Sequence, residues 1–121
     1  MITIRRGTFE TNSSSTHSIC ICTKDNYDKW VNGELYLNES GSWYDRDNLL
    51  TGKEFITKDE AINFLKHYNY SYDEDEDLSY QLREYEIYDY DSWGEEYEHS
   101  VNHFVTPSGD EMVVECYYGY N

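Results

Sequence analysis

Three cysteines and several histidines are the residues of this chain whose types and spacing best suit metal chemistry. Cys20 and Cys22 are separated by one residue, so in a β-strand both thiols would point to the same side and could reach one ion. A structural zinc site takes four sulfur or nitrogen ligands. These two cysteines with two histidines, or all three cysteines including Cys116 with one histidine, would supply them. The alternative is that all three cysteines are small buried apolar residues.

Other catalytic patterns are weak or absent in the sequence. His99 and His103 would share one face of a helix, but Ser100 stands where a zinc protease needs a glutamate. Serines surround His17, yet no G-x-S-x-G motif is present, and hydroxyl-rich stretches more often bond to the backbone in turns. Neither nucleotide-binding glycine motif occurs. We therefore expect that the chain is not an enzyme.

Charge is the strongest compositional feature. The 121 residues include 25 acidic and 9 basic ones, a net charge of −16, whereas solubility of a small domain needs a magnitude of only about 2–8. Such an excess disfavours direct binding to nucleic acids or to anionic membranes. Residues 67–121 alone hold fifteen acidic residues, one basic residue and eleven of the fourteen tyrosines. An acidic, tyrosine-rich surface of this kind favours a basic protein partner.

The candidate partner-binding residues lie in the second half of the chain. Carboxylates on a rigid surface can stand where DNA phosphates would stand, and tyrosines, including Tyr90, would add contact area. The alternative is a solvated face that serves only solubility. The candidates are Asp73, Glu74, Asp75, Glu76, Asp77, Glu84, Tyr85, Glu86, Tyr88, Asp89, Asp91, Glu95, Glu96 and Glu98.

Hydrophobic periodicity predicts an α+β fold, with a small antiparallel sheet and one or two packed helices. A helix should begin at Thr57, because Glu60 three residues later completes a capping box. A second helix is expected from Leu78, with a strand from Glu84 as the alternative. Strands are expected around Ile2 and Ile4, at 16–23, at 33–38, and in a hairpin of 101–106 and 111–118.

The length predicts a single acidic domain, 1–121, in which 1–66 form a sheet plus a helix and 67–121 form the acidic tyrosine-rich segment and the hairpin. No apolar run reaches the roughly 18–20 residues that a membrane span requires. The N-terminal sequence has no export signal, and three cysteines cannot all pair within one chain. We therefore expect a reducing cytosol.

Residues 6–19, which contain the run FETNSSSTHS, resemble the opening of a family of proteins from phages, prophages and Firmicutes. The likeness covers about a tenth of the chain and implies an origin in a mobile element, and with it the cytoplasm of a bacterial host cell. In length, charge and tyrosine content the chain also resembles the anti-CRISPR proteins, small inhibitors of CRISPR effector nucleases.

That second resemblance implies a non-enzymatic inhibitor of a type II CRISPR effector nuclease, which would block nucleic-acid binding or loading as a DNA mimic. Some proteins of this broad class bind zinc, which implies His17 as the fourth ligand beside Cys20, Cys22 and Cys116. The alternative function is a zinc-stabilised structural or regulatory phage domain with no inhibitory role.

Overall fold

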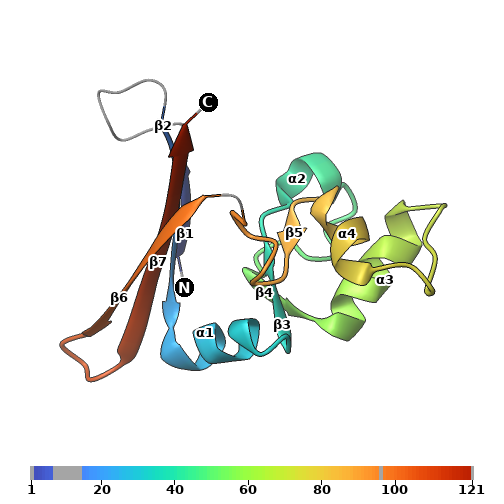
Figure 1. Cartoon of the computed structure of the whole chain (residues 1–121). Coiled ribbons are helices and arrows are strands. Elements are labelled where there is room, and N and C mark those ends of the chain that lie inside the picture. The colour runs from blue at the N-terminus through green and yellow to red at the C-terminus, as the bar shows by residue number, and fades with distance from the viewer. Residues whose placement is uncertain (1, 7–14, 96, 121) are drawn as a thin grey trace. The chain divides into compact units, whose positions relative to one another are not determined.

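The computed structural model of the chain describes residues 2–6, 15–95 and 97–120, with side chains described for 18–41, 43–95 and 97–117. The fold is α+β, as expected (Figure 1). The chain divides into two compact units: unit 1 is Met1–Asp28 with Gly94–Asn121, and unit 2 is Lys29–Trp93. Residue 66, after which the charge becomes strongly acidic, lies within a helix of unit 2 and marks no boundary between the units.

Unit 1 is a four-stranded antiparallel sheet in the order β1-β2-β7-β6, built from both ends of the chain. Its strands are β1 (Ile2–Arg6), β2 (Ser15–Thr23), β6 (Glu98–Val105) and β7 (Glu111–Tyr120). All four strands expected in these regions are confirmed. The β6–β7 turn closes where Gly109 takes a φ of 94°, a left-handed conformation that glycine adopts without steric cost.

One face of the unit 1 sheet is buried along the central strands β2 and β7. Cys20, Cys22, Val113 and Glu115 are at most 1% exposed there. Helix α1 (Lys24–Val31) follows β2 directly and begins where the Thr23 hydroxyl accepts a hydrogen bond from the Asn26 N–H at 3.2 Å. No pattern in the sequence predicts this helix, which lacks a long apolar stripe: Trp30 is its buried residue.

Unit 2 is built on a smaller antiparallel sheet in the order β4-β3-β5. The strands are β3 (Leu35–Asn38), β4 (Phe55–Thr57) and β5 (Ile87–Tyr88), and the helices are α2 (Gly41–Tyr44), α3 (Lys58–Tyr68) and α4 (Leu78–Arg83). Strand pairing puts Tyr36, Ile56 and Ile87 on one face of the sheet. These three residues form a core with Phe64 and Leu65 of α3 and other apolar side chains.

The opposite face of the unit 2 sheet packs against an aromatic cluster centred on Trp30. The Trp30 ring lies 5.7 Å from Phe55, 5.0 Å from Tyr90 and 5.3 Å from Trp93, measured between ring centroids. The indole N–H of Trp30 donates to the Tyr88 carbonyl oxygen at 3.1 Å. Trp30 and Trp93 are at most 1% exposed, so this small sheet buries side chains on both of its faces.

The two expected helices of unit 2 are present, one of them shortened. In α3, Thr57 Oγ1 accepts from the Glu60 N–H at 3.2 Å and Glu60 Oε1 accepts from the Thr57 N–H at 3.0 Å, which confirms the capping box. Helix α4 ends at Arg83 and β5 follows, as in the alternative interpretation. Glu86 separates them with a left-handed φ of 59°, which cannot continue a helix. No helix in the described chain is long and apolar enough to cross a membrane.

Candidate functional site

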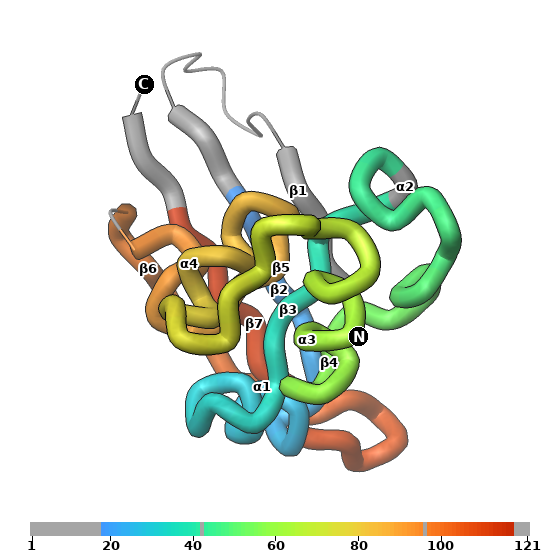
Figure 2. The backbone as a smooth tube through the Cα atoms, turned by 90° about the vertical axis from the view of Figure 1, so that its right-hand side faces the viewer, coloured from blue at the N-terminus to red at the C-terminus, as the bar shows by residue number. Residues whose placement is uncertain are grey.

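The acidic loop, residues 73–77, connects α3 to α4 and lies on the surface of unit 2. In Figure 2 the yellow-green segment that contains it crosses the near side of the unit. The first residue of the loop, Asp73, is held by Gln81 of α4. Gln81 is buried, with only 5% of its surface exposed. Gln81 Oε1 accepts from the Asp73 N–H at 3.1 Å, and its amide nitrogen donates to the Asp73 carbonyl oxygen at 2.9 Å. Two opposed bonds from one buried amide therefore anchor the start of the loop.

Further hydrogen bonds hold the rest of the acidic loop. Asp73 Oδ1 accepts from the Asp75 N–H at 2.9 Å, and Asp77 Oδ1 accepts from the Ser79 N–H at 3.0 Å, which caps the N-terminus of α4. Asp73 and Asp77 thus order the backbone. Glu74 and Glu76 are exposed between them, and their carboxylates add charge to a loop whose conformation is already set.

The tyrosines beside the acidic loop are not those expected from the sequence. Tyr70 is fully exposed and Tyr80 is 56% exposed. Tyr85 instead packs into the core of unit 2, with its ring 5.4 Å from Phe64 and 5.6 Å from Tyr44 between centroids. Burial also raises the pKa of the Tyr85 hydroxyl, with Glu84 adding to the shift. The aromatic contact area near the loop therefore comes from Tyr70 and Tyr80.

Two further expected contact residues also have structural roles. Tyr88 accepts the Trp30 indole N–H through its backbone, and Tyr90 packs edge-on against the Trp30 ring. Both lie in the part of unit 2 that holds the aromatic cluster. Neither is among the large exposed apolar side chains of the described chain.

The remaining acidic candidates of unit 2 differ in their surroundings. Glu84 and Asp91 are exposed, and Glu86 is partly buried. Asp89 accepts from the Ser79 hydroxyl at 2.8 Å and from the Ser92 N–H at 2.9 Å. Burial alone would raise the pKa of Asp89, but the hydrogen bonds from both serines outweigh it and lower the pKa. Asp89 therefore stays ionised and joins α4 to the turn after β5.

The last three acidic candidates lie outside unit 2. Glu95 and Glu98 are exposed residues of unit 1, and Glu96 falls outside the described residues. The candidate set is therefore divided between the units, with most of it in unit 2. Unit 2 holds sixteen acidic and six basic residues, so it carries most of the net charge of the chain.

The structure does not bring the three cysteines together. Residues directly opposite each other on paired strands share a face of the sheet. Cys20 is opposite Glu115 and Cys116 is opposite Ile19, so Cys116 lies on the other face from Cys20 and Cys22. Its Sγ atom is 3.2 Å from the Ser100 Oγ atom. Strand alternation thus separates Cys116 from the two buried thiols.

The histidines do not complete a metal site among the described side chains. The backbone of His17 pairs with Arg6 and Tyr118 in the sheet, while its side chain lies outside the described part. His99 and His103 lie on strand β6 and not on a helix. Within the described side chains, no group of three or more cysteines, histidines and acidic residues is placed to hold a metal ion.

A polar network in unit 1 that the sequence did not reveal is centred on the buried carboxylate of Glu115. Glu115 is fully buried; its Oε1 accepts from the Tyr27 hydroxyl at 2.6 Å, and its Oε2 is 2.6 Å from His99 Nδ1. His99 Nε2 lies 2.8 Å from the Gly94 carbonyl oxygen. The three side chains come from α1, β6 and β7, so no local sequence pattern could have revealed the network.

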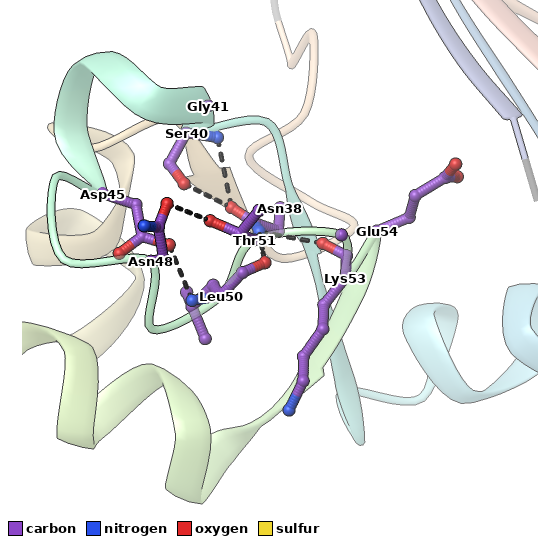
Figure 3. Close-up of a pocket in the computed structure, with 10 residues that line it drawn as sticks. Asn38, Ser40, Gly41, Asp45, Asn48, Leu50, Thr51, Lys53 and Glu54 are labelled. Carbon is purple, nitrogen blue, oxygen red and sulfur yellow. Dashed lines mark hydrogen bonds between the residues drawn. The ribbon is translucent and has the colours of Figure 1, made fainter.

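A polar hollow of about 310 Å³ opens in unit 2 between β3 and the segment before β4 (Figure 3). Asn38 holds its wall: the amide nitrogen donates to the Lys53 carbonyl oxygen at 2.8 Å, and the amide oxygen accepts from the Ser40 hydroxyl at 2.6 Å. Asp45, 2% exposed, accepts from the N–H groups of Leu49 and Leu50 at 2.8 and 2.6 Å. Several polar groups of the wall therefore bond to one another across the loop.

No protein-family model, curated protein or solved structure matches the chain. Function is therefore inferred from the contacts, burial and charge of the described residues.

Proposed function

We propose that this chain is a non-enzymatic inhibitor that binds a basic host protein through the acidic loop of unit 2. The observation that carries the proposal is the double hydrogen bond between Gln81 and the backbone of Asp73. A solvated acidic run has no need of such an anchor. A loop that competes with nucleic acid gains from one, because ordering it before binding removes an entropic cost from association.

The surroundings of the acidic loop support a protein partner. Tyr70 and Tyr80 offer large rings with few rotatable bonds, which protein interfaces favour. The excess of acidic over basic residues in unit 2 would steer a basic groove toward the loop and speed association. Carboxylates in that groove would occupy the positions of nucleic-acid phosphates.

The partner we propose is a nucleic-acid-guided nuclease, specifically a type II CRISPR effector. This choice rests on the resemblance in length and charge to anti-CRISPR proteins, and it fits a surface that is acidic and aromatic. Such a nuclease holds its guide–target duplex in a positively charged channel, which is the electrostatic complement of the acidic loop. The inhibitor would act in the cytoplasm by blocking the binding or loading of nucleic acid.

Binding of the purified chain to a type II effector nuclease, measured across a salt series, tests this proposal. Affinity should fall steeply between low and physiological salt, because exposed charges are screened within about 10 Å at those concentrations. The double variant Glu74→Lys/Glu76→Lys should bind about tenfold or more weakly, since it reverses charge without removing the loop's own hydrogen bonds.

The matched control is Glu34→Lys/Asp59→Lys, which makes the same charge change at exposed positions of unit 2 outside the loop. Equal losses in both double variants would show that net charge alone attracts the partner. Affinity that does not change with salt would contradict the electrostatic mechanism itself.

A further inference from the structure

Strand β6 is an edge of the unit 1 sheet, and each of its residues from Glu98 to Val105 is exposed. On one side it pairs with β7; on its other side, the described part of the chain places no strand. Figure 1 shows β6 at the margin of this sheet. An edge strand presents backbone N–H and C=O groups with which an added strand can pair.

Natural proteins normally protect such an edge with charges, prolines or bulges, and residues 100–105 of β6 contain no acidic residue, lysine, arginine or proline. The register with β7 runs through eight consecutive pairs without a bulge. Val101, Phe104 and Val105 are 41, 44 and 63% exposed, so this strand leaves three apolar side chains in contact with solvent. This edge is long, regular and partly apolar, in a chain that is otherwise highly charged.

A hollow of about 220 Å³ lies beside the C-terminal half of β6. Phe104, Val105 and Met112 provide apolar lining, while Lys24 and Glu111 provide charged groups of opposite sign. In strand addition the backbone hydrogen bonds supply affinity, and pockets for alternate side chains supply specificity. Strand β6 offers both features.

We propose that β6 binds an extended segment of another protein, which adds to the sheet along residues 100–105 and places one apolar side chain in the hollow. The segment should carry basic residues beside that apolar side chain, because residues 94–121 hold six acidic residues and no basic one. A second copy of the chain is a poor occupant, since each copy carries a net charge of −16. This edge belongs to unit 1 and is independent of the acidic loop.

The test uses the full chain and a short synthetic peptide of alternating valine and threonine with a lysine at each end. Amide hydrogen exchange is followed by NMR with and without the peptide. We expect exchange to slow about tenfold at the outward-facing amides of residues 100–105. The same peptide with alternate amides N-methylated should give no protection, because it cannot complete the ladder. Protection elsewhere, or none, would overturn the proposal.

Two variants complete the test. Asn102→Lys puts a charge on the edge and should weaken peptide binding about tenfold. Asn63→Lys makes the same change at an exposed position of α3 and should leave binding unchanged. If both variants weaken peptide binding equally, the binding depends on net charge alone and strand addition is refuted. Sedimentation of the free chain as a dimer with β6 already protected would instead identify a second copy as the occupant and also refute the proposal.

Discussion

His99 Nδ1 lies 2.6 Å from Glu115 Oε2 within unit 1, and this carboxylate is completely buried. The His99 side chain is 27% exposed, so one member of the pair is buried and the other is partly accessible to solvent. The second ring nitrogen faces the Gly94 carbonyl oxygen. The imidazole of β6 therefore contacts both a buried carboxylate on β7 and the backbone at Gly94.

Replacing the buried acid should destabilise unit 1. We expect Glu115→Gln to lower the free energy of unfolding by about 2–4 kcal/mol. The substitution breaks a largely buried pair, because one carboxylate oxygen that faces Tyr27 or His99 is replaced by an amide nitrogen. Urea denaturation measures the loss. Glu111→Gln, an exposed substitution on the same strand, should cost less than about 0.5 kcal/mol. Equal costs in the two variants would mean that the pair contributes nothing to stability.

The backbone at Gly94 should not tolerate a side chain. Gly94 has a φ of 64°, and a Cβ atom there would lie 2.4 Å from the Tyr117 ring, itself stacked on Tyr97. Gly94→Ala should therefore destabilise the chain by about 1–3 kcal/mol more than Gly33→Ala. Gly33 has a similar positive φ but open space around it, so the pair of variants separates backbone strain from the clash. Thermal melting of both variants checks the difference.

Asp45 should make the stability of unit 2 depend on acid pH. Burial opposes its charge, but hydrogen bonds from Tyr68, Leu50 and Leu49 outweigh burial and lower the pKa of this carboxyl. A lowered folded-state pKa stabilises the fold at pH values above the unfolded-state pKa of about 3.9. That contribution is lost as the pH falls through the lower, folded-state pKa.

Asp45→Asn should accordingly cost about 2–3 kcal/mol at pH 7, since an amide nitrogen would face a backbone N–H. Its stability should also decline less steeply than that of the unmodified chain between pH 5 and 3. Urea denaturation across this pH range provides the measurement. Asp91→Asn changes an exposed acid of the same unit and should leave the curve unchanged. If the free energy of unfolding falls equally steeply with pH in the unmodified chain and in both variants, Asp45 does not cause the acid sensitivity.

The elements that could be predicted from sequence are those that local patterns define. The Thr57–Glu60 capping box fixes the start of α3, and the turn with Gly109 lies between the strands of the β6–β7 hairpin. Helix α1 was missed because its tertiary contacts, above all those of Trp30, stabilise a segment without a strong apolar pattern.

The candidate sites were less predictable, because they depend on strand register and burial. Alternation along β2 correctly puts Cys20 and Cys22 on one face, but only the pairing of Ile19 with Cys116 shows that the third thiol is on the other face. With fourteen tyrosines in the chain, composition could not distinguish the core position of Tyr85 from the exposed position of Tyr70.

Thiol labelling tests the placement of the cysteines and the zinc hypothesis together. Cys20 and Cys22 are 1% and 0% exposed, whereas Cys116 is partly accessible. The native chain should therefore react rapidly at Cys116 alone and at all three thiols after unfolding. A chelator should not change the native pattern. If chelation exposes Cys20 and Cys22 and elemental analysis finds zinc, a metal holds these thiols.

The exposed tyrosines should contribute to binding but not to stability. Tyr70→Ala should leave the free energy of unfolding within about 0.5 kcal/mol of that of the unmodified chain, because the Tyr70 side chain is fully solvent-exposed. The same change should weaken binding to a type II effector nuclease about tenfold. Tyr85→Ala should instead cost about 3–5 kcal/mol of stability, because its ring packs against Phe64 and Tyr44. Unaltered nuclease binding by a folded Tyr70→Ala protein would exclude Tyr70 from the interface.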